Sequence, residues 1–299
     1  MTTDDARADA APTMAGDDWM SPEWDRHRSL PASVIKPSPA RLYDYYLGGK
    51  DNFAADREAA EKIRAVFPGL SDAAWANRGF HGRAAIWMAE RGIRQFVDVG
   101  AGLPTMDNTH QVVQRIAPDA RVVYVDNDRQ VVCHARALLA DGPDITAIDA
   151  DVRDPGAILG NRELRELIDF SEPAGLLMTA VMHFVSDADD PWGLVARLIS
   201  AFPAGSYLAL SHATADGVPP SAVQAGMDVY ERATERVYPR SRAEIERFFD
   251  GLELMPPYEH CPPAVAYVGE WGCADALLAD SDGSRALYCG VGQRSQAQT

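Results

Sequence analysis

The spacing of hydrophobic residues changes twice along this chain of 299 residues. Residues 1–35 show no hydrophobic periodicity and contain several prolines, which is typical of a disordered or loosely packed arm. Across residues 36–93 the apolar positions recur with helical spacing, and we expect a helical cap there. Across residues 94–293 short apolar runs alternate with helix-length segments, which predicts strands and helices in turn, and residues 294–299 form a tail.

The first helical segment, "SPARLYDYYLGG", carries boundary signals at both ends. Ser38 fits the N-cap, Pro39 the first helical position and Gly48 the C-terminal stop. Two more helices are predicted in "AADREAAEKIRAVF" and "ANRGFHGRAAIWMAERG". These three helices make up the predicted cap.

Five apolar runs after residue 94 lack strict alternation, as expected for strands that are buried on both sides. They are "RQFVDVG", "ARVVYVDND", "DITAIDADVRD", "AGLLMTAVMHFV" and "GSYLALSHAT". Two later runs, "LELMPPYEH" and "ALYCGVGQR", predict an antiparallel pair at one edge. The fold class is therefore α/β: a Rossmann-like, mostly parallel seven-stranded sheet with helices on both faces. A helical insert is expected at about residues 216–250, with a capping box at Ser241 and Glu244.

Composition excludes several classes of function. The net charge of −16 and the pI near 4.8 would repel a phosphate backbone, so nucleic acid is not an expected partner. The sequence contains no run of 18 apolar residues, which would predict a membrane span, and it does not begin with a secretory signal. We therefore expect a cytoplasmic protein. The four cysteines form no C-x-x-C pair, and the acidic "DADDP" reads as a loop in which Asp190 caps the next helix, so no metal site is predicted.

Candidate chemistry gathers at the carboxyl ends of the predicted strands, where ligands bind in such sheets. Asp98 precedes a loop that contains Gly100 and Gly102. Asp126 ends the next strand, where an acidic side chain can accept hydrogen bonds from ribose hydroxyls. Asp151 follows the third strand, where a carboxylate can accept from an exocyclic amine.

The glycine loop favours one nucleoside ligand over another. A dinucleotide loop would carry a third glycine at position 105, but Thr105 stands there, after Pro104. S-adenosylmethionine has no phosphate and tolerates these residues, while Asp98 can support its ammonium group. Each feature alone has a plainer interpretation as a turn, a strand end or a helix cap. Three features in order, at these spacings, favour a cofactor site.

With these residues placed, the chain resembles the actinobacterial S-adenosylmethionine-dependent methyltransferases once catalogued as a domain of unknown function. The resemblance covers residues 36–292. Its blocks are "PSPARLYDYYLGGKDNFAADREAAEKI", "ANRGF", "IRQFVDVGAGLPTMDNTHQVVQRIAPDARVVYVDND", "AVMHFVSDADDP" and "GSYLALSHAT". The chain departs from the family at Ala101, where threonine is frequent, and at Phe184, where a second histidine is frequent.

The resemblance implies a class I methyltransferase fold and S-adenosyl-L-methionine as the cofactor. By position it assigns Gly100, Ala101 and Gly102 to the methionine part, Asp126 to the ribose, Asn127 and the pair Asp151 and Val152 to the adenine, and Ala180 to the neighbourhood of the sulfonium. In this fold the N-terminal helices commonly cover the cofactor. Lys50 or Arg78 can then pair with the methionine carboxylate, Asn52 can hydrogen-bond it, and Tyr46 or Phe53 can cover the methyl group. Alternatively, Tyr43, Tyr46 and Phe53 are simply the apolar face of the cap.

Methyl transfer needs a general base only if the acceptor holds its proton at neutral pH. His183, just after the fourth strand, and His212, ending the fifth, are the candidates, because both strand ends face the crevice. Either can instead be a hydrogen-bonded structural histidine. His81, His110 and His134 lie in helical stretches and are interpreted as surface or packing residues.

The main hypothesis is a methyltransferase for a small-molecule acceptor, methylated on oxygen or nitrogen. The alternative is a sensor that binds adenosylmethionine or adenosylhomocysteine without turnover, which the lack of a base would favour. A nicotinamide-dependent oxidoreductase is disfavoured by Thr105 and by the absence of a Tyr-x-x-x-Lys pair. The acceptor pocket is expected to involve the arm, the N-terminal helices and the insert, where Met227, Tyr230 and Tyr238 are available to line it. The helix that carries Met227 and Tyr230 can equally be ordinary amphipathic packing. A homodimer is compatible with the sequence, which encodes no oligomeric state.

Overall fold

The computed structural model describes residues 36–138, 142–274, 279 and 281–295. Its helices are α3 (Pro39–Tyr46), α4 (Ala54–Arg64), α5 (Leu70–Glu90), α6 (Thr109–Val113), α7 (Arg129–Leu138), α8 (Pro155–Gly160), α9 (Arg162–Leu167), α10 (Pro191–Ser200), α11 (Pro220–Tyr230) and α12 (Arg242–Glu246). Its strands are β1 (Gln95–Val99), β2 (Arg121–Asp126), β3 (Ile145–Asp149), β4 (Gly175–Thr179), β5 (Tyr207–Ala213), β6 (Glu253–Leu254), β7 (Ala266–Tyr267) and β8 (Leu287–Gln293). The predicted arm, residues 1–35, lies outside the described residues.

One sheet organises the molecule, with the strand order β3-β2-β1-β4-β5-β8-β6 and with β7 also paired to β8. Strands β1 to β5 are parallel, and β8 runs antiparallel to β5. The prediction of a mostly parallel sheet with an antiparallel edge is therefore confirmed. The sheet has one strand more than the seven predicted, because the two-residue strand β7 also pairs with β8 at this edge. Pro256 and Pro257 follow the short strand β6, and proline cannot donate a hydrogen bond to a sheet ladder.

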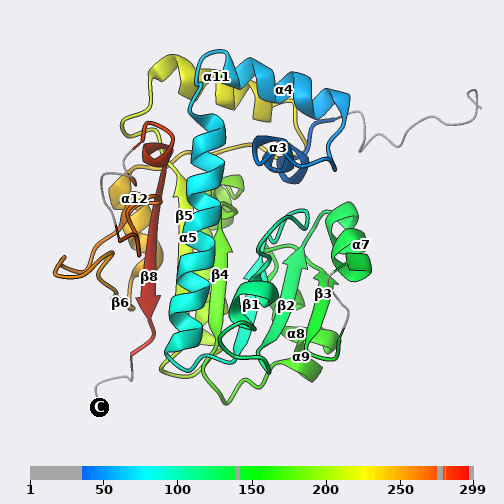
Figure 1. Ribbon diagram of the computed structural model, residues 1–299, viewed down its shortest axis with the longest axis vertical. Coiled ribbons are helices and arrows are strands. Elements are labelled where there is room, and N and C mark those ends of the chain that lie inside the picture. Colours follow the sequence, from blue (N-terminus) through cyan, green and yellow to red (C-terminus); the bar gives the residue numbers. More distant parts are fainter. Residues whose placement is uncertain (1–35, 139–141, 275–278, 280, 296–299) are drawn as a thin grey trace, which may run out of the picture.

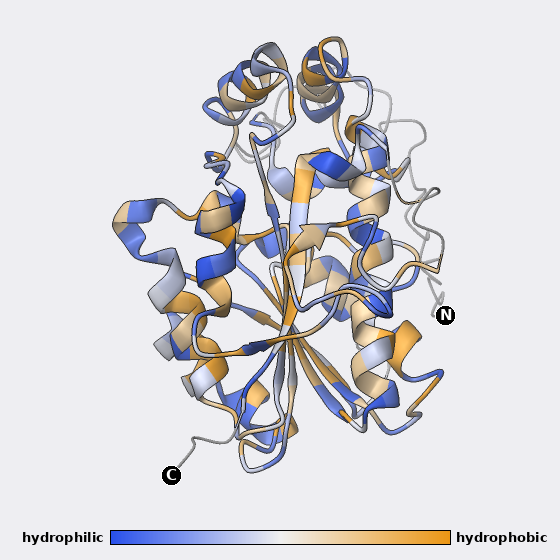
Figure 2. Cartoon of the chain, turned by 90° about the vertical axis from the view of Figure 1, so that its left-hand side faces the viewer, coloured by the Kyte–Doolittle hydropathy of each residue, from blue (hydrophilic) through white to orange (hydrophobic). Residues whose placement is uncertain are grey.

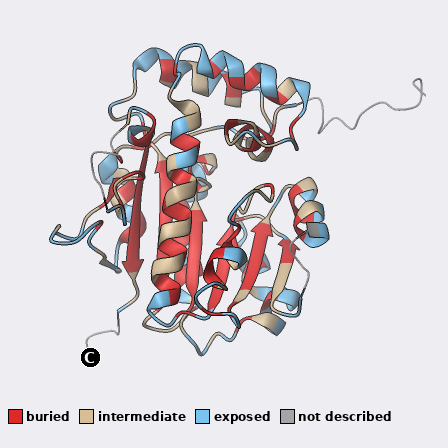
Figure 3. Cartoon of the chain, in the orientation of Figure 1, coloured by how far each residue is buried: buried red, intermediate tan, exposed pale blue. Residues whose placement is uncertain are grey.

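Helices cover both faces of this sheet, as the edge-on view shows (Figure 2). Neighbouring residues of one strand enter different cores: Val97 packs with helices α8, α9, α10 and α12, whereas Phe96 packs with α5, α6 and α7. Both side chains are at most 2% exposed. The strands are buried on both faces (Figure 3), which explains their unbroken apolar runs in the sequence.

Helices α3, α4 and α11 form a cap beyond the carboxyl ends of the parallel strands (Figure 1). They share a small core that includes Leu42 of α3, Ile63 of α4 and Val229 of α11. Helix α5 starts beside this cap and then runs along the face of the sheet. A space between the cap and the sheet edge is thereby bounded by α3, α5 and α11.

The predicted helix ends are confirmed where side chains supply the caps. Ser38 accepts a hydrogen bond from the amide of Arg41, Asp190 accepts one from Gly193, and Ser241 forms a capping box with Glu244. In the described part of the chain, no helix is both long and apolar enough to cross a membrane.

A buried ion pair joins α3 to α4. Arg41 Nε lies 2.8 Å from Asp56 Oδ2, and the two side chains are 2% and 0% exposed. The carboxylate of Asp56 also accepts hydrogen bonds from the amides of Ser38 and Phe53. A buried charge needs an ion-pair partner and hydrogen bonds to replace water. By accepting from residues at the starts of both helices, the carboxylate of Asp56 holds α3 and α4 together.

We expect Asp56→Ala to lower the free energy of unfolding by about 3–5 kcal/mol, because it leaves Arg41 buried without its carboxylate. Urea-induced unfolding measures the change. Arg64→Ala, which breaks a half-exposed pair with Glu61, is the matched control and should change stability far less. Equal losses in the two variants would contradict the role given to the buried pair.

Candidate active site

A cavity of about 610 Å³ lies between the cap and the carboxyl ends of β1, β2 and β4. This volume falls within the range of about 300–1,000 Å³ that is usual for small-molecule sites. Of the residues predicted from sequence, those that line the cavity are Tyr46, Arg78, Asp98, Gly100, Ala101, Gly102, Asp126, Asn127, Val152, Ala180 and His183. Tyr43 and Tyr230 line it too. The predicted residues outside its lining are Lys50, Asn52, Phe53, Asp151, His212, Met227 and Tyr238.

The glycine loop after β1 packs closely against the side chain of Val181. Gly100 has φ +71°, and a Cβ atom there would lie 2.4 Å from Val181 Cγ2. Gly102 has φ +67°, and its amide donates to Asp126 Oδ2 at 2.9 Å. Both conformations favour glycine, and only glycine fits at position 100. The loop therefore presents mainly backbone atoms, rather than side chains, to the cavity.

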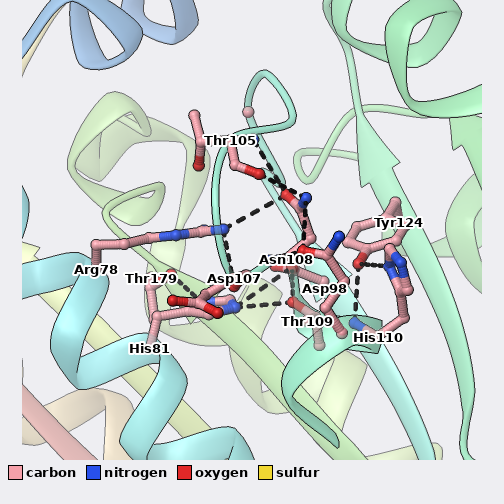
Figure 4. Close-up of polar contacts among 12 residues, drawn as sticks. Arg78, His81, Asp98, Thr105, Asp107, Asn108, Thr109, His110, Tyr124 and Thr179 are labelled. Carbon is pink, nitrogen blue, oxygen red and sulfur yellow. Dashed lines mark hydrogen bonds and ion pairs between the residues drawn. The ribbon is translucent and has the colours of Figure 1, made fainter. Parts of the chain in front are cut away.

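A chain of hydrogen bonds holds the carboxylate of Asp98, which is 3% exposed (Figure 4). Thr109 Oγ1 donates to Asp98 Oδ2 at 2.6 Å, so the Nε2–H of His81 must donate to Thr109 Oγ1 at 2.8 Å. The Nδ1 atom of His81 then accepts from Thr179 Oγ1 at 2.9 Å. Burial lowers the pKa of His81 to about 4, so the ring is neutral at pH 7.

His81 therefore corrects the sequence interpretation, which treated it as a surface or packing residue. It is 3% exposed and lines the cavity. Asn77 and Arg78, four and three positions before it on α5, line the same cavity. The spacing of residues 77, 78 and 81 puts them on one face of a helix, and this was the signal in the sequence that could have placed His81 at the site.

Arg78 holds the segment after the glycine loop (Figure 4). Its Nη2 donates to the carbonyls of Met106 at 2.9 Å and Asp107 at 3.0 Å. Asp107 has φ +54°, an unusual conformation that these bonds support. The guanidinium thus shapes the loop beside the cavity, in addition to any contact with a ligand.

Asp126 ends β2 with its carboxylate at the cavity. Besides the amide of Gly102, it accepts from the amide of Asp128 at 2.9 Å. Burial raises its pKa to about 6, more than these bonds lower it. The group is therefore mostly ionised at pH 7, and the position suits a pair of ribose hydroxyls.

Asp151 does not direct its carboxylate into the cavity, in contrast to the role predicted for it at the adenine. Its oxygens accept from the amide and guanidinium of Arg153 and from Asn127 Nδ2, at 2.8 to 3.0 Å. Burial raises its pKa, but these bonds together lower it more. Val152 and Ala150 contribute the apolar surface there instead.

Asn52 holds a turn rather than a ligand. Its Nδ2 donates to Asp44 Oδ2 at 2.8 Å, and its Oδ1 accepts from Arg57. Asp44 also accepts from the amide of Asp51, and a Cβ at Gly49 would collide with Asp44 Oδ1. The segment "YDYYLGGKDNF" is thus built around the carboxylate of Asp44, and Lys50 on this turn is exposed, outside the cavity lining.

Neither His183, which follows β4, nor His212, near the end of β5, has the geometry of a general base. His212 is 0% exposed, with Nδ1 2.7 Å from the Ala213 carbonyl and Nε2 2.7 Å from Arg240 Nη1, so both nitrogens are engaged. His183 lines the cavity, but its Nδ1 accepts from the Ala213 amide at 3.2 Å. Burial, and then Arg240, lowers the pKa of His183 to about 3. His183 therefore presents an Nε2–H donor to the cavity.

A second hydrogen-bond chain, which the sequence did not reveal, joins the sheet to the cap. The amide of Ala180 donates to Ser211 Oγ at 2.9 Å, and Ser211 Oγ donates to Asn77 Oδ1 at 2.5 Å. Asn77 Nδ2 donates to the Tyr43 hydroxyl at 2.9 Å, and that hydroxyl donates to the Ala74 carbonyl at 3.0 Å. Ala180 has φ +56°, so this chain holds a strained residue at the end of β4.

The strand order, the reversed edge strand and the two-glycine loop before the carboxylate of Asp126 define a class I, Rossmann-like methyltransferase. The model of the S-adenosyl methyltransferase family matches residues 26–295, and the chain belongs to this family. Its enzymatic class is thus adenosylmethionine-dependent methyl transfer, as the resemblance implied, and the oxidoreductase alternative is discarded.

Two solved structures from actinobacteria are similar over most of the chain. One is a protein of domain-of-unknown-function family 574 from Streptomyces avermitilis, 39% identical, with a TM-score of 0.81, covering 88% of this chain and 99% of that one. The other is a putative methyltransferase from Thermobifida fusca, 38% identical, with a TM-score of 0.80, covering 87% and 96%. No curated protein matches the chain.

The affinity for adenosylmethionine should depend on the ionisation of Asp126. Ribose hydroxyls donate to the carboxylate, so affinity should be level above pH 7 and fall by up to about tenfold per pH unit below its pKa of about 6. Isothermal titration calorimetry from pH 5 to pH 8 measures this. Asp126→Asn should bind about ten- to a hundredfold more weakly and lose the pH dependence. An unchanged profile in that variant would assign the titration to another group.

His183 should remain neutral, with its proton on Nε2, from pH 8 to pH 5. The Ala213 amide fixes the tautomer, and burial holds the pKa near about 3. Two-bond proton–nitrogen correlation spectra report both properties, and His183→Gln assigns the signals. A titration midpoint between pH 6 and pH 7 would restore His183 as a general base.

Proposed function

We propose that this chain methylates an oxygen or nitrogen atom of a small organic molecule, which binds between the cofactor residues and the cap. One observation carries the proposal. A single cavity includes the glycine loop and Asp126 on one side, and Tyr46, Tyr230 and His183 on the other. A site for the cofactor alone would not need the second set of residues.

The residues of the first side fit adenosylmethionine. The Gly100 position, which has no room for a Cβ, leaves backbone for the methionine part. The Asp98 carboxylate, aligned by Thr109, suits the ammonium group, and Asp126 suits the ribose. Ala150 and Val152 offer apolar surface to the adenine, with Asn127 at its edge.

The bound cofactor supplies an electrophilic methyl group on a sulfonium. The acceptor's lone pair forms the new bond to carbon, the electron pair of the carbon–sulfur bond returns to sulfur, and the acceptor's proton passes to water. The protein holds acceptor and methyl in line, which can contribute about 7–11 kcal/mol to lowering the barrier. His183 supports this by donating a hydrogen bond rather than by removing a proton.

The absence of a base at His183 and His212 is the observation that favours the sensor alternative. It does not outweigh methyl transfer, because an acceptor that is already nucleophilic, or that loses its proton to water, needs no protein base. A macromolecular acceptor is less suited to the site, since the cavity lies beneath the cap and the net charge is −16.

Calorimetric titration with adenosylmethionine and adenosylhomocysteine tests the cofactor side of the proposal. We expect micromolar binding of both by the wild type, and loss of binding in Asp126→Ala. Asp149→Ala is the matched control, because Asp149 pairs with Asp126 in register on β3 but lies outside the cavity lining. Its affinity should equal that of the wild type.

If neither compound binds, or if both variants bind equally well, the proposed function is wrong. Binding followed by transfer of a radiolabelled methyl group to a compound from actinobacterial extract would extend the test to turnover. Binding without transfer to any fraction would support the sensor.

A further inference from the structure

Side chains from four separate elements form one hydrogen-bond chain that ends at the carboxylate of Asp98 (Figure 4). Thr179 ends β4, His81 lies in the middle of α5, Thr109 begins α6, and Asp98 lies in β1. Thr179, His81 and Asp98 line the cavity, whereas Thr109 lies behind its lining and is 1% exposed. The chain therefore supports a carboxylate at the cavity from residues that are far from it in the sequence.

The direction of every bond in this chain follows from Asp98, because a carboxylate can only accept. The one hydroxyl proton of Thr109 goes to Asp98 Oδ2, so Thr109 Oγ1 accepts from His81 Nε2–H. His81 Nδ1 is then left to accept from Thr179. The tautomer of His81 and the direction of the Thr109 hydroxyl are thus set together, and both serve the orientation of the carboxylate.

His81 orients this carboxylate without neutralising it. Its Nε2 lies 3.7 Å from Asp98 Oδ2, so a protonated ring would form an ion pair with Asp98 and compensate the negative charge. Burial lowers the pKa of His81 to about 4, and no such pair forms at pH 7. The carboxylate therefore keeps its charge for a cation that comes from elsewhere.

Asp98 keeps one carboxylate oxygen for such a cation. Thr109 occupies Oδ2, and no residue that the structure describes donates a hydrogen bond to Oδ1. The side chain is 5% exposed and lines the cavity, and no described lysine or arginine forms an ion pair with it. A carboxylate that is largely removed from water without a cationic partner costs free energy, which a ligand ammonium group would recover.

We infer that His81 and Thr109 are positioning residues, which hold the carboxylate of Asp98 toward the ammonium group of the cofactor. This inference deepens the proposed function and rests on it. His81 acts through Thr109 and has no need to touch the ligand. The chain therefore sets selectivity for the amino group, and with it the distinction between adenosylmethionine or adenosylhomocysteine and adenosine thioethers that lack this group.

Calorimetric titration with three thioethers isolates the ammonium group. Adenosylhomocysteine carries both the ammonium and the carboxylate, 5′-S-(3-carboxypropyl)-5′-thioadenosine carries the carboxylate alone, and 5′-methylthioadenosine carries neither. The wild type should bind adenosylhomocysteine at least about tenfold more tightly than the carboxypropyl compound, because only the former can pair with Asp98.

Thr109→Val removes the hydroxyl and keeps the shape of the side chain. It should weaken adenosylhomocysteine about three- to tenfold, the effect of one hydrogen bond, and leave the other two compounds unchanged. His81→Leu should do the same, and His81→Gln, whose amide can still donate to Thr109, should restore most of the loss. Thr146→Val is the matched control, because Thr146 Oγ1 also donates to a carboxylate, that of Glu163 at 2.9 Å, but lies outside the cavity lining. It should bind all three compounds as the wild type does.

The pattern across the three compounds separates recognition from folding. Equal weakening of all three in Thr109→Val would mean that the chain supports the fold rather than the carboxylate, and would overturn the inference alone. Unchanged affinity for adenosylhomocysteine in Thr109→Val and His81→Leu, no recovery in His81→Gln, or no preference of the wild type for the ammonium compound would each overturn it too. Failure of the wild type to bind either adenosylhomocysteine or methylthioadenosine would overturn the proposed function, and this inference with it.

Discussion

The need to pair buried polar groups shapes this molecule, and the chain from Ala180 through Ser211 and Asn77 to Tyr43 meets it. The amide of Ala180, the left-handed residue at the end of β4, donates to both the backbone carbonyl and the hydroxyl of Ser211. Ser211 in turn needs Asn77, and Asn77 needs a partner in the cap. The position of the cap over the sheet is therefore linked, through this chain of hydrogen bonds, to the backbone of Ala180, which lines the cavity.

The parts of the site that sequence could predict are those whose signal is local. Asp98, the glycine loop and Asp126 each follow directly after an apolar run, and parallel strands bring such ends to one edge. The same locality made the helix caps at Ser38 and Ser241 predictable. The two-residue strand β7 carries no such signal, because its pairing with β8 arises from tertiary packing.

The residues that sequence missed have their partners far away in the chain. His81 bonds Thr179, 98 positions later, and Asn77 bonds Ser211, 134 positions later. Sequence placed His183 and His212 correctly at the strand ends, but it could not indicate their protonation. That depends on burial and on Arg240, which comes from the insert and bonds the Met182 and Val185 carbonyls as well as His212. The same insert residue thus shapes the loop after β4 and removes His212 as a base.

The distribution of charge separates the two halves of the cavity. The half at the carboxyl ends of the strands, which we propose binds the cofactor, holds the carboxylates of Asp98 and Asp126, whose hydrogen-bond partners there are neutral hydroxyl and amide donors. The other half, which we propose binds the acceptor, holds Arg153 and Glu235, which neutralise each other. A cationic sulfonium compound is therefore attracted to the first half more strongly than the neutral thioether that remains after transfer. In the proposed reaction, the same carboxylates would favour both the binding of the sulfonium compound and the exchange of the neutral product for it.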